Sequence, residues 1–213
     1  MTTSPHPPLP RRIALKFKRI VRELDKDERA WGKVWPMIQP IEGWLCGGQE
    51  RWLFDTARAL SDGANLVEIG SYKGRSTCCL GFGCRGTGKR VFAIDPFNGG
   101  PDLPLRDSFA EFSANINRCE LSDYVTPKVG TSLEIAQGWN RPIHFLFIDG
   151  SHKYEDVVAD FEAYLPYVVE GGIVGLHDVD ANWPGVLKAW NDVCRHRLVE
   201  LGACASLAYG RKP

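Results

Sequence analysis

The sequence predicts an α/β fold with a mostly parallel central sheet and helices on both faces. Short apolar runs alternate with longer amphipathic segments from residue 48 almost to the C-terminus, which is typical of strands joined by crossover helices. Each of five apolar runs stops at a glycine, an aspartate or a histidine, as strands do where they leave a buried sheet. With 213 residues, 44% of them hydrophobic, the chain can bury one substantial core.

The first 40 residues are interpreted as an N-terminal extension, and residues 41–213 as a single domain. Residues 1–10 are rich in proline and are expected to lack regular structure. Apolar residues then recur at helical spacing among basic ones, which predicts a basic amphipathic helix near residues 11–24. Such a helix either packs on the domain or a second subunit, or binds a membrane surface or a partner. Its short length and the acidic residues that follow favour packing. In a homodimer, the second subunit would supply the surface on which the helix packs.

The remaining elements follow in order along the chain. A helix is expected over residues 48–60, with Trp52, Leu53, Thr56 and Leu60 on one face. Strands are expected at residues 66–69, 91–94, 125–129, 143–148 and 173–176, and helices near 75–83, 106–118, 132–138, 154–168 and 184–200. The tail, residues 203–209, is a candidate for one more strand, and the Gly- and Pro-rich loop 98–107 is a candidate lid.

Composition argues against several classes of function. The 26 basic side chains balance 26 acidic ones, so the net charge gives no reason to expect a nucleic-acid partner. No apolar run approaches membrane-spanning length, and the N-terminus lacks a signal-peptide pattern. The seven cysteines are odd in number and contain no C-x-x-C pair, which indicates a reducing compartment, most simply the cytoplasm. A small molecule is the expected partner.

Polar side chains gather where the predicted strands end. Glu68, Asp95, Asp149, His177 and Asp178 all lie at or beside the last residue of a strand. Ligands of open α/β sheets bind at the carboxyl ends of the strands. These five residues are therefore expected to surround a ligand.

Residues 67–77 combine a strand, a glycine turn and the start of a helix. Gly70 permits a close backbone approach that a Cβ would block, and Ser76 or Thr77 is expected to cap the helix. Gly70 and Gly74 lie four residues apart, so the segment lacks the dinucleotide-binding spacing. Glu68 would repel a pyrophosphate but suits a cationic ligand with an amino group.

Asp95 ends the next strand, where an acid typically accepts hydrogen bonds from ribose hydroxyls. The alternative is that Asp95 merely opens a solvated loop, because Pro96 and Gly99 follow it closely. Taken together with the glycine turn, Asp95 favours a nucleoside ligand.

Three segments then carry a resemblance to a known family. Residues 68–76 (EIGSYKGRS) resemble the first motif of class I S-adenosylmethionine-dependent methyltransferases, in its E-[IL]-G-x-x-x-G-x-S form, and residues 93–97 (AIDPF) resemble their second-strand motif. Residues 147–154 (FIDGSHKY), Asp160 and residues 171–178 (GGIVGLHD) are similar to the macrocin O-methyltransferase-like group, which is related to the catechol and caffeoyl-CoA O-methyltransferases. The resemblance covers about residues 42–190. It implies a Rossmann-like fold and methyl transfer to a hydroxyl of a sugar or natural-product intermediate.

The resemblance also implies the residues that bind the cofactor. The amino-acid part of S-adenosylmethionine would be surrounded by Glu68, Gly70, Ser71 and Gly74, with Ser76 at its carboxylate and Asp149 nearby. Asp95 would bind the ribose. The adenine would lie near Thr131 and Ser132.

At the acceptor end, the resemblance implies a divalent metal ion between Asp149 and Asp178, with His177 in the same cluster. Oxygen ligands suit Mg²⁺, and the ion would lower the pKa of the acceptor hydroxyl. His152 would then take the proton as general base. His177, however, stands where related enzymes have a carboxylate. Either it faces away, or the site takes another ion, or no metal binds. A purely structural interpretation of His177 is a buried histidine that is hydrogen-bonded near the sheet end.

Two other functions stay open at this point. His152 and His177 with one aspartate match the ligand set of a non-haem iron hydroxylase or oxygenase, and a non-catalytic S-adenosylmethionine-binding partner is the third hypothesis. Trp183, in the loop after the last of these strands, either walls the acceptor pocket or packs on the next helix.

Overall fold

The computed structural model describes residues 27–99 and 107–213, which divide into two compact units at residues 37 and 38. In the first unit, residues 27–37 are helical, and Trp31 stacks on Trp35 one turn later with ring centroids 5.4 Å apart. The basic helix expected near residues 11–24 lies outside the described residues, as does most of the candidate lid.

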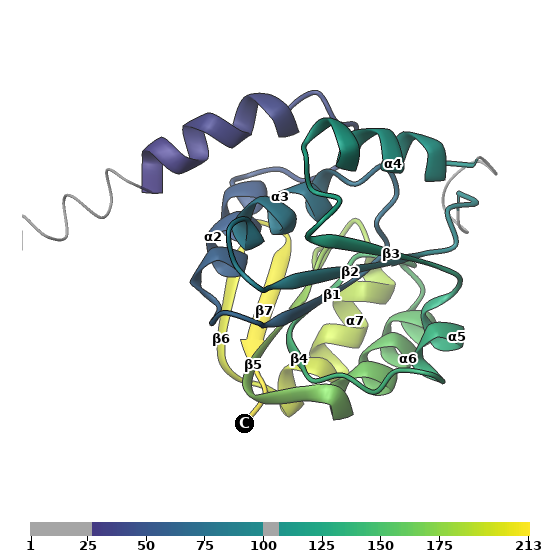
Figure 1. Cartoon of the computed structure of the whole chain (residues 1–213). Helices are drawn as coiled ribbons and strands as arrows, with labels where there is room; N and C mark the ends of the chain where they lie inside the picture. The colour runs from purple at the N-terminus through teal and green to yellow at the C-terminus, as the bar shows by residue number, and fades with distance from the viewer. Residues whose placement is uncertain (1–26, 100–106) are drawn as a thin grey trace, which may run out of the picture. The chain divides into compact units, whose positions relative to one another are not determined.

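The second unit is built on a seven-stranded sheet in the order β3-β2-β1-β4-β5-β7-β6 (Figure 1). The strands are β1 (Asn65–Ile69), β2 (Arg90–Asp95), β3 (Val125–Val129), β4 (Ile143–Ile148), β5 (Val168–Leu176), β6 (Val199–Cys204) and β7 (Leu207–Arg211). Strands β1 to β5 are parallel, and β7 is antiparallel to both β5 and β6. The predicted mostly parallel sheet is confirmed.

Helices cover both faces of this sheet (Figure 1). They are α2 (Gln49–Ala59), α3 (Arg75–Cys84), α4 (Phe109–Arg118), α5 (Ser132–Ala136), α6 (Tyr154–Tyr164) and α7 (Pro184–Asp192), with short 3₁₀ turns at Leu165–Tyr167 and Cys194–Arg197. Helices α2 and α3 pack against each other, and α6 packs against both α5 and α7. This crossover arrangement is the one that a parallel sheet requires.

The C-terminal part differs from the sequence-based prediction in three ways. The helix expected over residues 184–200 ends at Asp192, the strand expected at 173–176 begins five residues earlier at Val168, and the single tail strand is a hairpin of β6 and β7. Strand β6 is at the edge of the sheet and most of its residues are exposed. Its sequence, VELGAC, is short and ends without a continuous apolar run, and its apolar Val199 and Leu201 are themselves exposed, so a search for buried strands passes over it.

Helix α2 also buries a different face from the predicted one. Leu53 is fully buried as expected, but the other buried residues are Gln49, Glu50, Phe54 and Ala57. The expected Trp52, Thr56 and Leu60 are only half-buried. Trp52 instead packs against Tyr209 of β7, with ring centroids 4.7 Å apart.

Strands β1 and β4 form the centre of the sheet and position the site. Their apolar residues are buried on both faces, which is why the two segments read as continuous hydrophobic runs. The chain leaves β1 for β2 on one side and reaches β4 on the other, so the connections diverge at the carboxyl ends of this pair. A topological switch point of this kind is where open α/β sheets bind ligands.

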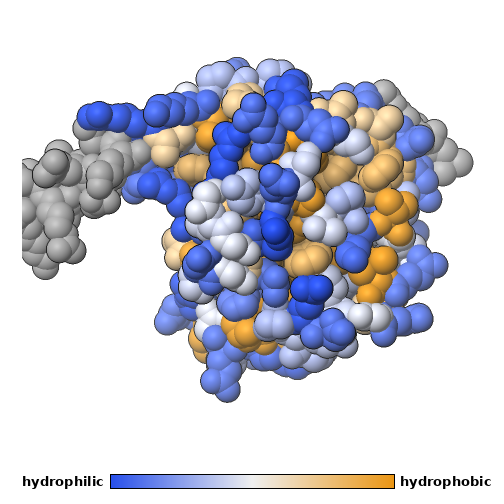
Figure 2. All heavy atoms as spheres, in the orientation of Figure 1, coloured by the Kyte–Doolittle hydropathy of each residue, from blue (hydrophilic) through white to orange (hydrophobic). Residues whose placement is uncertain are grey.

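Hydrophilic and hydrophobic residues are interspersed over the face seen in Figure 2, with hydrophobic residues gathering on the side where β3 and α5 lie. Val129 and Leu133 belong to these elements and are 59% and 47% exposed.

Among the described residues, none of the helices combines the length and the apolar character needed to cross a membrane.

Candidate active site at the carboxyl ends of the strands

The turn after β1 has a geometry that only glycine allows at Gly70. Its φ is +86°, and a Cβ there would lie 2.0 Å from the carbonyl oxygen of Asp149 at the end of β4. The turn then closes with a hydrogen bond from the Gly74 N–H to the Ser71 carbonyl (2.7 Å), and α3 begins directly after it. Gly70 thus brings the β1 turn against the first residue after β4, so that the two predicted parts of the site meet.

Asp95 fixes the conformation of this turn. Its Oδ2 accepts the backbone N–H groups of Ser71 and Tyr72, each at 2.8 Å, and its Oδ1 accepts that of Phe97. Asp95 is half-buried, so it does more than open a solvated loop. That Asp95 binds the ribose of a cofactor stays a prediction.

Glu68 is a fully buried carboxylate directly beneath the turn. Its Oε2 accepts hydrogen bonds from the hydroxyls of Ser71 (2.8 Å) and Thr77, and Ser76 also bonds the carboxylate. The expectation that Ser76 or Thr77 caps α3 is wrong, because Gly74 is the N-cap and no side chain caps the helix. The Oε1 of Glu68 has no hydrogen-bond partner among the described residues.

Burial raises the pKa of Glu68 from 4.5 to about 7, although the hydroxyls of Ser76, Thr77 and Ser71 act in the opposite direction and the charge of Asp149 adds to the increase. The folded state therefore keeps a proton on Glu68 at pH values where the unfolded chain has released it.

A Glu68→Gln variant is expected to remove this pH dependence. Relative to the variant, the wild type should lose up to about 3 kcal/mol of its free energy of unfolding as the pH rises from the unfolded pKa through the folded one. Urea denaturation of both proteins between about pH 5 and about pH 8 measures the difference. A difference that stays constant over this interval would contradict the assignment of the proton to Glu68.

The turn after β3 contains the two residues expected near adenine. Thr131 caps α5 in a reciprocal capping box with Glu134. The Ser132 hydroxyl donates to Asp160 of α6, a buried carboxylate whose pKa burial raises to about 6. Thr131 and Ser132 lie between the exposed apolar side chains of Val129 and Leu133, so the turn presents an open apolar surface at the sheet edge.

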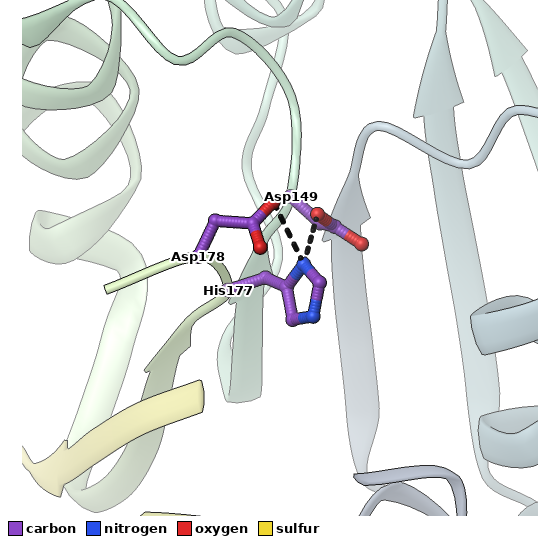
Figure 3. Close-up of side chains that lie close together, drawn as sticks. All are labelled: Asp149, His177 and Asp178. Atoms are coloured by element: carbon purple, nitrogen blue, oxygen red, sulfur yellow. Dashed lines mark ion pairs between the residues drawn. The ribbon is translucent and has the colours of Figure 1, made fainter. Parts of the chain in front are cut away.

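Two acids and a histidine meet at the ends of β4 and β5 (Figure 3). The Nδ1 of His177 lies 3.0 Å from Asp149 Oδ1 and 3.2 Å from Asp178 Oδ2. The alternative that His177 faces away from the acids is therefore wrong. It is nevertheless a buried, hydrogen-bonded histidine, with its side chain only 3% exposed.

The charges in this cluster depend on one another. Burial by itself would lower the pKa of His177, but the carboxylates of Asp149 and Asp178 outweigh it and raise the pKa to about 10. Burial would raise the pKa of Asp178, but its bonds to His152 and His177 hold it well below its ordinary range. Burial raises the pKa of Asp149 in spite of its contact with His177. In the absence of an ion, the cluster thus holds a cationic ring between acids.

Sequence reasoning missed Gln49, which contacts the other side of His177. The side chain of Gln49 is fully buried at the start of α2, and its Oε1 lies 3.1 Å from His177 Nε2. The two residues are 128 positions apart and Gln49 belongs to none of the motifs, so nothing in the sequence links them.

His152 lies beside this cluster, as the sequence predicts, and contacts Asp178 and Trp183. Its Nε2 lies 3.1 Å from Asp178 Oδ2, and its ring stacks on Trp183 with centroids 3.6 Å apart. Trp183 also packs on the hydrophobic core, and its role as a wall of the acceptor pocket stays a prediction. A small pocket lies here, and it is lined by Ile148, Asp149, Gly150, Ser151, His152, Val157, His177 and Val186.

The cluster has a donor set that fits a divalent ion. One ligand atom each from Asp149, His177 and Asp178 can be chosen so that all three lie within 4.8 Å of one another. The set holds one imidazole nitrogen and two carboxylate oxygens. This group has one histidine and two carboxylates, so it differs from the two-histidine, one-carboxylate set of the non-haem iron oxygenases.

Comparison with known proteins gives a family match over the same region. The sequence model of a family described as "Methyltransferase domain" matches residues 67–179, more than half of the chain. The uncharacterized protein R132 of Acanthamoeba polyphaga mimivirus is 30% identical over 141 residues, which are 62% of this chain and 60% of that protein. The chain thus spans less than two thirds of this relative.

Several solved structures share the fold. An O-methyltransferase from Bacillus cereus in complex with S-adenosylhomocysteine has a TM-score of 0.61 at 20% identity, covering 86% of this chain and 91% of that one. The O-methyltransferase NovP has a TM-score of 0.67 at 19% identity, with coverage of 77% and 79%. TomG from Streptomyces achromogenes, an O-methyltransferase solved with S-adenosylmethionine, has a TM-score of 0.62 at 16% identity and 89% coverage of both chains.

Proposed function

This chain belongs to the methyltransferase-domain family, and on that premise we propose that it is an S-adenosylmethionine-dependent O-methyltransferase that acts on a hydroxyl of a small molecule, such as a sugar or a natural-product intermediate. The observation that carries the proposal is a juxtaposition. The glycine turn after β1 and the acid–histidine cluster after β4 and β5 meet at one sheet edge, where Gly70 contacts the backbone of Asp149. A cofactor in the turn and an acceptor at the cluster would lie side by side.

The side chains around the turn suit S-adenosylmethionine. The Oε1 of Glu68, which has no hydrogen-bond partner within the described part of the chain, is an acceptor for a cationic amino group, and Asp95 at the end of β2 holds the turn beside which a ribose would bind. The exposed Val129 and Leu133 offer apolar cover to an adenine ring beside Thr131 and Ser132. These contacts support a nucleoside cofactor with a cationic end.

His152 has the geometry of a general base. Asp178 Oδ2 lies 3.1 Å from His152 Nε2, and a carboxylate only accepts hydrogen bonds, so a neutral His152 bonded to it has its hydrogen on Nε2 and would take a proton at Nδ1. The carboxylate would stabilise the resulting imidazolium. Stacking on Trp183 fixes the plane of the ring.

The proposed reaction is an in-line displacement. The acceptor oxygen forms a bond to the methyl carbon as the carbon–sulfur bond breaks, and the hydroxyl proton passes to His152. The cofactor supplies an electrophilic methyl group, so positioning accounts for much of the rate. A divalent ion held by Asp149, His177 and Asp178 would lower the pKa of the acceptor hydroxyl and orient its oxygen.

The experiment that tests the proposal follows the methyl group. The protein is incubated with S-adenosylmethionine labelled in the methyl carbon and a panel of hydroxylated sugars and phenols, and the products are analysed by mass spectrometry and NMR. Label in a methyl ether, with release of S-adenosylhomocysteine, is the expected result. Label on nitrogen or carbon only, or an oxygenated product without label, would contradict the assignment.

A further inference from the structure

We propose that Gln49 is a positioning residue that sets the tautomer of His177, and that it thereby makes the Asp149–His177–Asp178 cluster selective for a first-row transition-metal ion over Mg²⁺. The inference rests on the proposed function for what the ion does, but not for whether the ion binds. Its evidence is the hydrogen-bond pattern around a single buried amide.

The orientation of the Gln49 amide is fixed by three backbone and side-chain contacts. Its Oε1 accepts the N–H of Cys46 at 2.8 Å, and its Nε2 donates to Ser206 Oγ at 3.0 Å and to the Cys204 carbonyl at 3.3 Å. A flipped amide would set N–H against N–H at Cys46 and oxygen against oxygen at Cys204. Because the side chain is fully buried, water cannot compensate for those mismatches.

The amide orientation determines the tautomer of His177. An amide oxygen only accepts hydrogen bonds, so His177 Nε2, 3.1 Å from Gln49 Oε1, carries a hydrogen. When an ion displaces the second proton of the ring, the neutral imidazole keeps its one N–H on Nε2. The lone pair is then on Nδ1, the nitrogen that faces Asp149 and Asp178 (Figure 3). Histidines that bind metals are held in this way, with the second ring nitrogen donating to a fixed acceptor.

The distances around Nδ1 also suit an ion. The separations of 3.0 and 3.2 Å from Nδ1 to the two carboxylate oxygens are close to the roughly 3 Å between adjacent ligands of an ion with bonds of about 2.1 Å. An ion would take the place of the proton that Nδ1 shares with the acids. Mg²⁺ prefers oxygen ligands and water, whereas imidazole favours transition metals such as Fe²⁺, Co²⁺ or Zn²⁺. One nitrogen among three ligands therefore shifts the preference of this site from Mg²⁺ towards a transition-metal ion.

The test is a calorimetric titration of the EDTA-stripped, full-length protein with CoCl₂ and, separately, with MgCl₂. The wild type should bind one Co²⁺ at least about tenfold more tightly than Mg²⁺. His177→Asp should bring the two affinities within about threefold of each other, because the donor set becomes all oxygen. His196→Gln, which removes an exposed histidine from the turn after α7, should behave as wild type.

Two substitutions isolate the contribution of Gln49. Gln49→Met keeps the length of the side chain but removes the acceptor, and should weaken Co²⁺ binding about 10- to 100-fold. Gln49→Glu keeps an acceptor for His177 and for Cys46 but sets an oxygen against the Cys204 carbonyl. It should therefore lower the free energy of unfolding, yet keep a higher Co²⁺ affinity than Gln49→Met. Circular dichroism shows which variants are folded. If Gln49→Met does not fold, pulsed EPR of the Mn²⁺-loaded wild type tests whether His177 binds the ion. A ¹⁴N coupling that is present in the wild type and absent from His177→Asp would identify the imidazole as a ligand.

Wild-type protein that binds Mg²⁺ as tightly as Co²⁺, or a His177→Asp variant with an unchanged ratio, would overturn the inference. So would the absence of ¹⁴N coupling, or a folded Gln49→Met variant with wild-type Co²⁺ affinity. Titrating S-adenosylhomocysteine into the same preparations separates the two proposals. Retained nucleoside binding without Co²⁺ preference overturns only the metal inference, whereas lost nucleoside binding overturns the proposed function.

Discussion

Replacing Gly70 by alanine is expected to weaken S-adenosylhomocysteine binding at least about 100-fold and to lower the free energy of unfolding by about 3 kcal/mol or more. The added Cβ would lie 2.0 Å from the Asp149 carbonyl oxygen, and the φ of +86° is itself strained for alanine. Because the obstacle is backbone at the end of a central strand, it cannot rotate aside. The β1 turn and the end of β4 must separate, which disrupts both halves of the site.

Gly171→Ala is the matched control for this substitution. Its φ is +71°, but a Cβ there meets no atom within 4 Å. The control should therefore lose only about 1 kcal/mol, from backbone strain alone, and keep its nucleoside affinity. Urea denaturation and calorimetry measure the two quantities. If the variants were equal in stability and in binding, the close approach of Gly70 to Asp149 would have no functional meaning.

His152→Gln is expected to lower kcat for methyl transfer about 10²- to 10⁴-fold while leaving the Kd for S-adenosylhomocysteine within about threefold of wild type. Glutamine can still donate a hydrogen bond to Asp178 and pack beside Trp183, but it cannot take a proton from the acceptor hydroxyl. The effect should therefore fall on the chemical step.

His196→Gln again provides the control, because this exposed histidine lies outside the site and its loss should change neither quantity. Single-turnover kinetics with a methyl acceptor found in the product screen separates chemistry from binding and release. A His152→Gln variant with wild-type single-turnover rate would remove this residue from the mechanism.

The central parallel strands were predictable from the sequence because β1, β2 and β4 are buried on both faces. Continuous apolar runs such as β1 and β4 are visible without tertiary information, and the polar residues that end them mark the binding edge. The exposed edge strand β6 carries no such signal. The predicted helix over residues 184–200 consequently ran through a 3₁₀ turn into that strand.

The site was predictable only where its residues lie in motifs. Asp149, His152, His177 and Asp178 were expected together, and the structure brings them together. The partners of their side chains were not predictable. Ser76 and Thr77 were assigned to the helix cap by local rules, but their hydroxyls bond the buried carboxyl of Glu68 beneath them, which is a tertiary feature. Gln49 contacts His177 from the start of α2, and Cys204 and Ser206 of the β6–β7 hairpin bond the same amide, so the contact depends on three segments that are distant in sequence.

The measurement that tests the central claim most directly is a calorimetric titration of S-adenosylmethionine and S-adenosylhomocysteine into wild type, Asp95→Ala and Asp62→Ala. Asp62 is a matched control, since it also accepts two backbone N–H groups but precedes β1 at the opposite edge of the sheet. We predict saturable binding of both ligands, weakened at least about tenfold by Asp95→Ala and unchanged by Asp62→Ala. Folded wild-type protein that binds neither ligand would contradict the methyltransferase account.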